Sequence, residues 1–185
     1  MKRYIIAILV LVSITEIMNL NADPNSKTDT SPENSSITAV NRFTGDRTSL
    51  VLQKDHVDLL AIPDTPQGIV PKLEDSCMRG NQLAVVMDYD FCFYYQLFEL
   101  EGGTWTLKQK ALFNAMNLSR QQRLLLVEMP DLTHAKLTFS KPGDNIFRKK
   151  GVVQPGDRQE IFKFSGDGTV LKNGNPYHYN SGREN

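Results

Sequence analysis

The sequence predicts a mainly β chain: a single antiparallel domain of the sandwich or barrel-like kind, with one short helix. Two observations predict this class. In residues 83–97 every second side chain is apolar or aromatic, which is the two-residue period of a strand with one buried face. In the C-terminal third, clusters of Gly with Asp, Asn or Pro recur at short intervals, and such frequent turns are typical of sandwiches and barrels. These clusters are residues 141–144, 154–157, 165–168 and 172–175.

The first 22 residues have the three parts of a secretory signal peptide. Lys2 and Arg3 form a basic head, residues 4–12 form an apolar run, and Ala22 is a small residue before a polar break. The run is shorter than the about 20 residues that a membrane-spanning helix needs. We therefore predict a secreted protein, extracellular or periplasmic, with no stable membrane span after cleavage. An uncleaved anchor is the alternative, because Leu20 is large where a small residue is preferred.

Residues 23–36 contain no large apolar side chain, which predicts a disordered lead-in. The β domain is expected to span residues 37–180, with a flexible tail at residues 181–185. Removing residues 1–22 takes the 21 basic and 21 acidic residues to 19 and 20, a net charge of −1. This balance provides no basic surface for nucleic acid, so no nucleic-acid partner is predicted.

The first ordered elements are expected to be two strands, residues 48–54 and 57–62, joined by a turn at Asp55 and His56. Next comes a stretch with three prolines and a glycine at its beginning. Proline cannot donate a ladder hydrogen bond, so residues 63–80 are predicted to form a long surface loop.

The core of the predicted domain is a hairpin. Residues 83–97 are expected to form one long strand, Gly102 and Gly103 supply the positive φ angles of a two-residue turn, and residues 104–107 return as a strand. The following residues 108–119 place Leu and Ala at spacings of three and four, which predicts the short helix. Further strands are expected at residues 123–129, 135–139, 146–153, 160–164, 169–171 and 177–179.

Two cysteines occur, Cys77 and Cys92, and an exported protein with an even number of nearby cysteines favours a disulfide. Closing a loop of about 15 residues would stabilise the fold by roughly 3 kcal/mol in the chain-entropy model. The alternative is two independent thiols, one of them buried as a small hydrophobic residue.

No motif predicts a catalytic residue, a metal site or a cofactor. Asp88 and Asp90 have a D-x-D spacing, but a calcium loop needs more oxygen ligands, so a solvated face or a tight bend is favoured. The three histidines lack the paired spacing of zinc ligands. Residues 165–168 fit a hairpin turn better than a phosphate loop. Asn34 and Asn117 match the N-glycosylation pattern.

Two hypotheses of function follow, and an enzyme is a weaker third. The first is a non-enzymatic binding protein for a macromolecular partner, most simply a protein, of the inhibitor, immunity or host-interaction type. Its recognition surface would be residues 63–79, including Arg79, with Asp88, Asp90 and Tyr94 on the neighbouring face. The second is a carrier of a small apolar ligand, with a barrel cavity lined by Phe91, Phe93 and Trp105.

Overall fold

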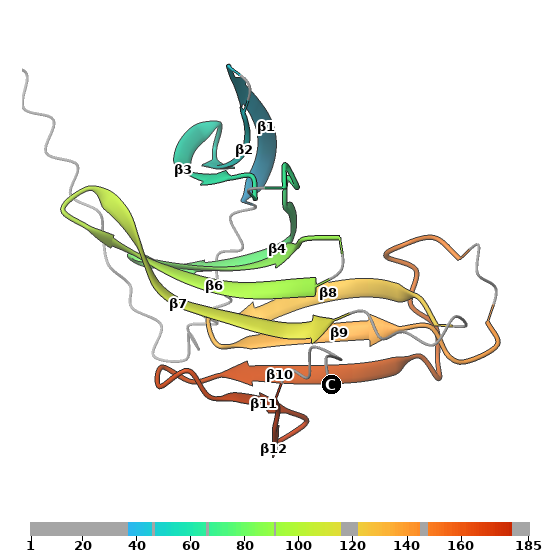
Figure 1. Cartoon of the computed structure of the whole chain (residues 1–185). Coiled ribbons are helices and arrows are strands. Elements are labelled where there is room, and N and C mark those ends of the chain that lie inside the picture. The colour runs from blue at the N-terminus through green and yellow to red at the C-terminus, as the bar shows by residue number, and fades with distance from the viewer. Residues whose placement is uncertain are drawn as a thin grey trace, which may run out of the picture. The chain divides into compact units, whose positions relative to one another are not determined.

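A computed structural model describes residues 37–45, 47–65, 67–90, 92–115, 122–144 and 148–178. Within these ranges the chain is mainly β, with twelve strands in three antiparallel sheets and no helix. Within each sheet every strand pairs with its neighbour in the sequence, so the chain forms three successive meanders (Figure 1). The predicted signal peptide and lead-in lie outside the described residues, as do residues 179–185, which include the predicted flexible tail.

Sheet A is the first meander and consists of three strands. They are β1 (Thr38–Thr44), β2 (Arg47–Lys54) and β3 (Val57–Pro63). The strands predicted at residues 48–54 and 57–62 are confirmed. The turn between them holds Asp55 and His56 at φ angles of 51° and 65°, the left-handed conformation of a tight two-residue hairpin turn. The strand β1 was not predicted, because its polar residues lack a two-residue period.

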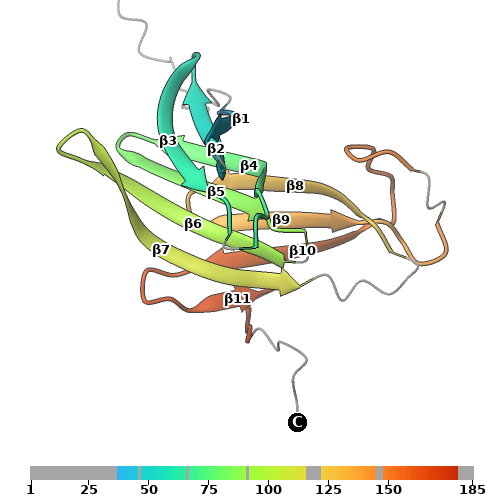
Figure 2. The same cartoon turned by 45° about the horizontal axis from the view of Figure 1, so that its top comes forward.

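Sheet B is the second meander, in the order β4-β5-β6-β7 (Figure 2). Its strands are β4 (Lys72–Arg79), β5 (Gln82–Asp88), β6 (Cys92–Glu101) and β7 (Thr104–Ala115). The prediction of one long strand over residues 83–97 is wrong, because the chain reverses after Asp88. The Tyr89 N–H donates to the Cys92 carbonyl at 3.0 Å, and Asp90 has a φ of 66°, which Asp tolerates better than most residues. The tight-bend interpretation of the D-x-D spacing is therefore confirmed.

Two further predictions in this region are wrong. The expected loop over residues 63–80 becomes strand β4 from Lys72 onward, because its prolines all lie before that residue.

The expected helix over residues 108–119 is strand β7 as far as it is described. A register shift against β6 places Lys108 as an extra residue, and this β-bulge moves the later apolar residues by one position. The extra residue changes the spacing of the apolar side chains before and after it from two to an odd number, and this spacing resembled the three-and-four spacing of a helix.

Sheet C is the third meander, in the order β12-β11-β10-β9-β8. Its strands are β8 (Leu124–Asp131), β9 (His134–Phe139), β10 (Arg158–Phe164), β11 (Val170–Lys172) and β12 (Asn175–Pro176). The predicted hairpin over residues 123–139 and the strands near 160–164 and 169–171 are confirmed, and residues 165–168 form the turn between β10 and β11. Strands were also predicted at 146–153 and 177–179, but their described parts, 148–153 and 177–178, are not strand.

One hydrophobic core, the B–C core, is built from sheets B and C. The ring of Phe113 in β7 lies 4.9 Å from Phe162 and 5.0 Å from Phe164, both in β10. Tyr95 stacks on Phe164 with a centroid distance of 4.0 Å, and its hydroxyl donates to the Leu132 carbonyl at 2.6 Å. Burial raises the pKa of Tyr95 to about 12, so this hydroxyl stays a donor at neutral pH.

A second core, the A–B core, is built from sheets A and B. Its buried members are Leu50, Leu52, Ile62, Leu83, Val85, Met87 and Phe98. Strand β5 belongs to both cores, because its odd-numbered side chains from Leu83 to Met87 lie in the A–B core, while Ala84 and Val86 lie in the B–C core. All five are fully buried. The predicted apolar row therefore does form the centre of the fold, although it is divided between two strands.

Candidate functional site

The predicted recognition residues do not come together at one place. Asp88 and Asp90 lie at the turn from β5 to β6, and Tyr94 lies in β6. Arg79 pairs with Gln82 at the opposite end of sheet B. Gln82 lies six positions before Asp88 in β5, and six positions of a strand span roughly 20 Å. Arg79 is thus separated from the other three residues by the length of a strand.

The turn from β5 to β6 holds a carboxylate that is only partly neutralised. The Asp88 carboxylate accepts a hydrogen bond from the Asp90 N–H, but its Oδ1 is buried and has no hydrogen-bond partner among the described residues. Burial raises the pKa of Asp88, and repulsion from Glu74 raises it further. Asp90 is more exposed and pairs with the Lys72 Nζ at 3.3 Å.

We expect the Asp88→Asn variant to be more stable than the wild type at pH 7. A raised folded-state pKa means that ionisation of Asp88 disfavours the fold: the contribution to stability is complete below the unfolded-state pKa and is lost as the pH rises through the folded-state pKa. An amide avoids this loss and can still accept the Asp90 N–H. Thermal unfolding of both proteins over a pH series should show a Tm advantage for the variant at pH 7 that vanishes in acid.

Asp167→Asn is the matched control for that experiment. Hydrogen bonds from the backbone and side chain of Thr169 lower the pKa of Asp167, so the ionised form favours the fold at neutral pH. This variant should therefore lose stability at pH 7, the opposite sign. If Asp88→Asn also lost stability at pH 7, the carboxylate of Asp88 would be paired by a group that the described residues do not include.

A band of side chains on β6 and β7, which we call the β6–β7 stripe, shares one face of sheet B. Directly paired residues project from the same face of a sheet, and the register pairs Tyr94 with both Met87 and Leu112, and Phe98 with both Leu83 and Leu107. This is the face that carries the A–B core. The stripe comprises Tyr94, Leu100, Trp105, Leu107, Lys110 and Leu112.

The β6–β7 stripe is only partly covered. Sheet A buries the β5 side chains on this face, and Trp105 packs at the margin of the A–B core. Leu107 is 47% exposed and Leu100 is 37% exposed. At the other end, the Lys110 ammonium lies 4.4 Å from the centroid of the Tyr94 ring, which also meets the edge of Tyr89 at 5.2 Å. The stripe is therefore a rigid, half-exposed band of aromatic, aliphatic and basic groups.

The residues that suggested a ligand cavity lie on opposite faces of sheet B. Phe93 is fully buried in the B–C core, 6.0 Å from Phe113, whereas Trp105 borders the A–B core. Phe91 lies outside the described residues. Phe93 and Trp105 thus do not line a common cavity.

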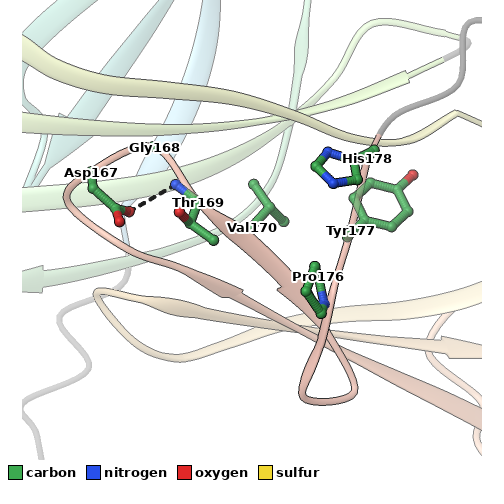
Figure 3. A pocket seen from close by; sticks show the side chains of 7 residues that line it. All are labelled: Asp167, Gly168, Thr169, Val170, Pro176, Tyr177 and His178. Atoms are coloured by element: carbon green, nitrogen blue, oxygen red, sulfur yellow. Dashed lines mark hydrogen bonds between the residues drawn. The ribbon is translucent and has the colours of Figure 1, made fainter.

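An open pocket of about 300 Å³ lies beside the turn from β10 to β11 (Figure 3). Asp167 is on one side of it and the rings of Tyr177 and His178 are on the other. The Asp167 Oδ1 accepts a hydrogen bond from the Thr169 N–H at 2.9 Å, so part of the hydrogen-bonding capacity of this carboxylate is used within the turn. The sequence gives no signal for this pocket, because residues 167–170 and 176–178 meet only through the pairing of β11 with its neighbours.

The predicted disulfide does not form, and both cysteines are free thiols. Cys77 lies opposite Ala84 in β5, while Cys92 follows the turn at Tyr89, on the other side of β5. The two cysteines are offset by five positions along β5 and by two strand spacings across the sheet, which places their Cα atoms on the order of 15 Å or more apart. A disulfide needs Cα atoms within about 7 Å. The alternative of two independent thiols is the one observed, with Cys77 buried in the B–C core.

The remaining sequence candidates give no reaction centre in the part of the chain that the structure describes. His134 bonds Asp131 locally, with Nδ1 at 2.9 Å from the carboxylate, and His56 lies in the turn of sheet A. Within the described ranges no three His, Cys, Asp or Glu side chains are placed to hold a metal ion, and no helix is long and apolar enough to cross a membrane. Asn34 and Asn117 lie outside these ranges.

The chain matches no protein-family model. A comparison with curated proteins likewise finds no match. A proposal of function for this chain therefore depends on its own residues and their geometry.

Proposed function

We propose that this chain is an exported, non-enzymatic binding protein, with a β-sandwich framework, that recognises a protein partner outside the cell or in a periplasm. The N-terminal basic head, apolar run and small residue support export. The observation that carries the binding proposal is the β6–β7 stripe, a half-exposed band that includes Tyr94 and Trp105 on paired strands.

The composition of the β6–β7 stripe is suited to protein recognition. Tyr and Trp are enriched among the residues that contribute most to protein interfaces, and a surrounding polar rim is typical. Charged pairs lie near both ends of the stripe: the Lys108 Nζ pairs with Glu101 at 2.6 Å near the hairpin end, and the Lys72 Nζ pairs with Asp90 at 3.3 Å in the turn that precedes β6. The ladder of β6 and β7 holds these side chains before binding, which reduces the ordering cost on association.

The proposal modifies the predicted recognition surface. Tyr94 and Asp90 remain part of it, since Tyr89 connects the turn to the Tyr94 ring. Asp88 and Arg79 are left out, because Asp88 projects from the face of the B–C core and Arg79 lies at the far end of β4. Residues 63–71 are not assigned to it.

Leu107→Ser tests the proposed surface, and Ile161→Ser is its matched control. Both side chains are 47% exposed, so both substitutions should leave the fold intact. Leu107 lies in the β6–β7 stripe, whereas Ile161 lies in sheet C. A partner captured by the mature wild-type protein from the extracellular fraction of its source, then purified, should bind Leu107→Ser about tenfold more weakly, a change of about 1.4 kcal/mol. Surface plasmon resonance should show unchanged binding to Ile161→Ser.

Equal affinity for the two serine variants would contradict the assignment of binding to the stripe. The carrier hypothesis predicts a different outcome. If the wild type captured no protein, while the fluorescence of its single Trp105 changed on titration with lipid-like apolar probes, the carrier would replace the binding protein.

A further inference from the structure

Five of the six sheet edges that the structure describes carry features that prevent pairing with other strands. An unpaired edge presents free N–H and C=O groups, and proteins protect such edges with Lys, Pro, bulges, short strands or covering loops. Strand β7 has Lys108, Lys110 and two register shifts against β6. Strand β12 has only two residues, one of them Pro176.

The other edges are protected by neighbours or by their sequence. Strand β4 lies beside β8, whose Met129 N–H donates to the Asp75 Oδ2 at 2.6 Å. A loop covers another part of β8, because the Leu125 carbonyl accepts the Gly151 N–H at 2.6 Å. Strand β3 ends at Pro63 and is bulged against β2.

Strand β1 is the exception among the described edges. Its seven residues contain no Lys, Pro or Gly, and its ladder to β2 runs through seven pairs without a register shift. Its one charged residue, Arg42, already pairs with Asp58 at 2.6 Å. Six of the seven residues are exposed, including Phe43 at 77% and Val40 at 39%. This is an unbulged, unprotected edge with a large exposed ring.

We propose that β1 pairs antiparallel with β1 of a second copy of this chain, in a register centred on Asn41. A strand that pairs with its own copy forms a twofold interface, in which each residue must suit the one opposite. The register places Thr38 opposite Thr44, Ala39 opposite Phe43, and Val40 opposite Arg42. The two sheets A then join into one continuous sheet.

The sequence of β1 suits self-pairing better than pairing with an unrelated strand. Thr opposite Thr is a favourable cross-strand pair. The small Ala39 gives room for the Phe43 ring of the second copy. The twofold symmetry repeats this contact, because Ala39 of the second copy faces Phe43 of the first. No charge faces a like charge directly, because Arg42 lies opposite Val40. An unrelated strand would need to supply each of these matches independently.

The interface is small, so the dimer is weak. Two seven-residue strands and a pair of Phe43 rings bury less than the about 1,200 Å² of total surface that specific, stable complexes usually bury. The dimer should therefore form and dissociate with concentration, and its formation does not depend on the β6–β7 stripe.

Sedimentation equilibrium of the mature chain, from low micromolar to near-millimolar concentration, tests the proposal. The wild type should shift from monomer to dimer. Asn41→Lys and Asn41→Glu each set two like charges opposite each other at the centre of the register, so each variant alone should stay monomeric. Asn41 is exposed, so neither change should disturb the fold, which circular dichroism checks. Thr106→Lys, on the edge strand β7, is the matched control and should dimerise as the wild type does.

Mixing the two variants gives the decisive result. A Lys opposite a Glu restores complementarity, so the mixture should form a heterodimer that neither variant forms alone. Three results would each overturn the proposal: a wild type that is monomeric at every concentration, a dimer that survives Asn41→Lys, or a mixture of the two variants that stays monomeric.

Discussion

Replacing Phe113 by alanine is expected to lower the free energy of unfolding by about 3 to 5 kcal/mol. The ring is fully buried and lies within 6.0 Å of Phe93 and within 5.0 Å of both Phe162 and Phe164. Its loss would leave a cavity between sheets B and C that the stiff strands around it cannot close. Urea unfolding followed by far-UV circular dichroism would measure the change.

Phe43→Ala is the matched control for Phe113→Ala. It removes the same ring from a position that is 77% exposed, so at low protein concentration it should change the free energy of unfolding very little. If the two variants unfolded at the same urea concentration, Phe113 would not be a member of the B–C core as described.

Arg148→Ala is expected to give the second large effect. Arg148 is buried, and its guanidinium bonds Asp157 at 2.7 and 2.8 Å and also pairs with Asp144. The Asp157 side chain is only 1% exposed, so removing the cation leaves two carboxylates facing each other with little access to water. The segment that links β9 to β10 would lose the ion pairs through which Arg148 joins Asp144 to Asp157. The Tm should fall several times more than in Lys136→Ala, which breaks the more exposed pair with Glu128.

The effect of Arg148→Ala should depend on pH with a defined sign. Hydrogen bonding to Arg148 lowers the pKa of Asp157 below its ordinary value. A lowered folded-state pKa contributes stability that is present above the unfolded-state pKa and is lost as the pH falls through the folded-state pKa. The Tm difference between wild type and Arg148→Ala should thus be largest near neutral pH and shrink in acid. A difference that did not change with pH would contradict the role of this ion pair.

The fold class was predictable, because alternation and turn chemistry are local signals. Gly102 and Gly103 have φ angles of 56° and 83°, as a tight hairpin turn requires, and Ala135, Leu137 and Phe139 point to one core as their spacing indicates. The short helix was wrong over residues 108–115, because the bulge at Lys108 disguised a strand period. Bulges depend on the partner strand, and a single strand's sequence does not show its partner.

The candidate site was predicted only in part, for a related reason. The alternation that placed Asp88, Asp90 and Tyr94 on one face assumed an unbroken strand, and the turn at Tyr89 reversed the chain between them. The same reversal separated Cys77 from Cys92. The β6–β7 stripe becomes visible only after the register of β6 on β7 is known. Tyr94 is only partly buried, because its position in β6 is out of phase with the buried Phe93 and Tyr95.

Strand β5 makes the three sheets thermodynamically dependent on one another. It contributes Leu83, Val85 and Met87 to the A–B core, and Ala84 and Val86 to the B–C core. If sheet A detached, one face of β5 would meet water; if sheet C detached, the other would. The two losses expose different side chains, so their costs add, whereas unfolding of β5 itself would give up burial in both cores at once. Such shared burial converts three local meanders, each formed from consecutive strands, into one cooperative unit.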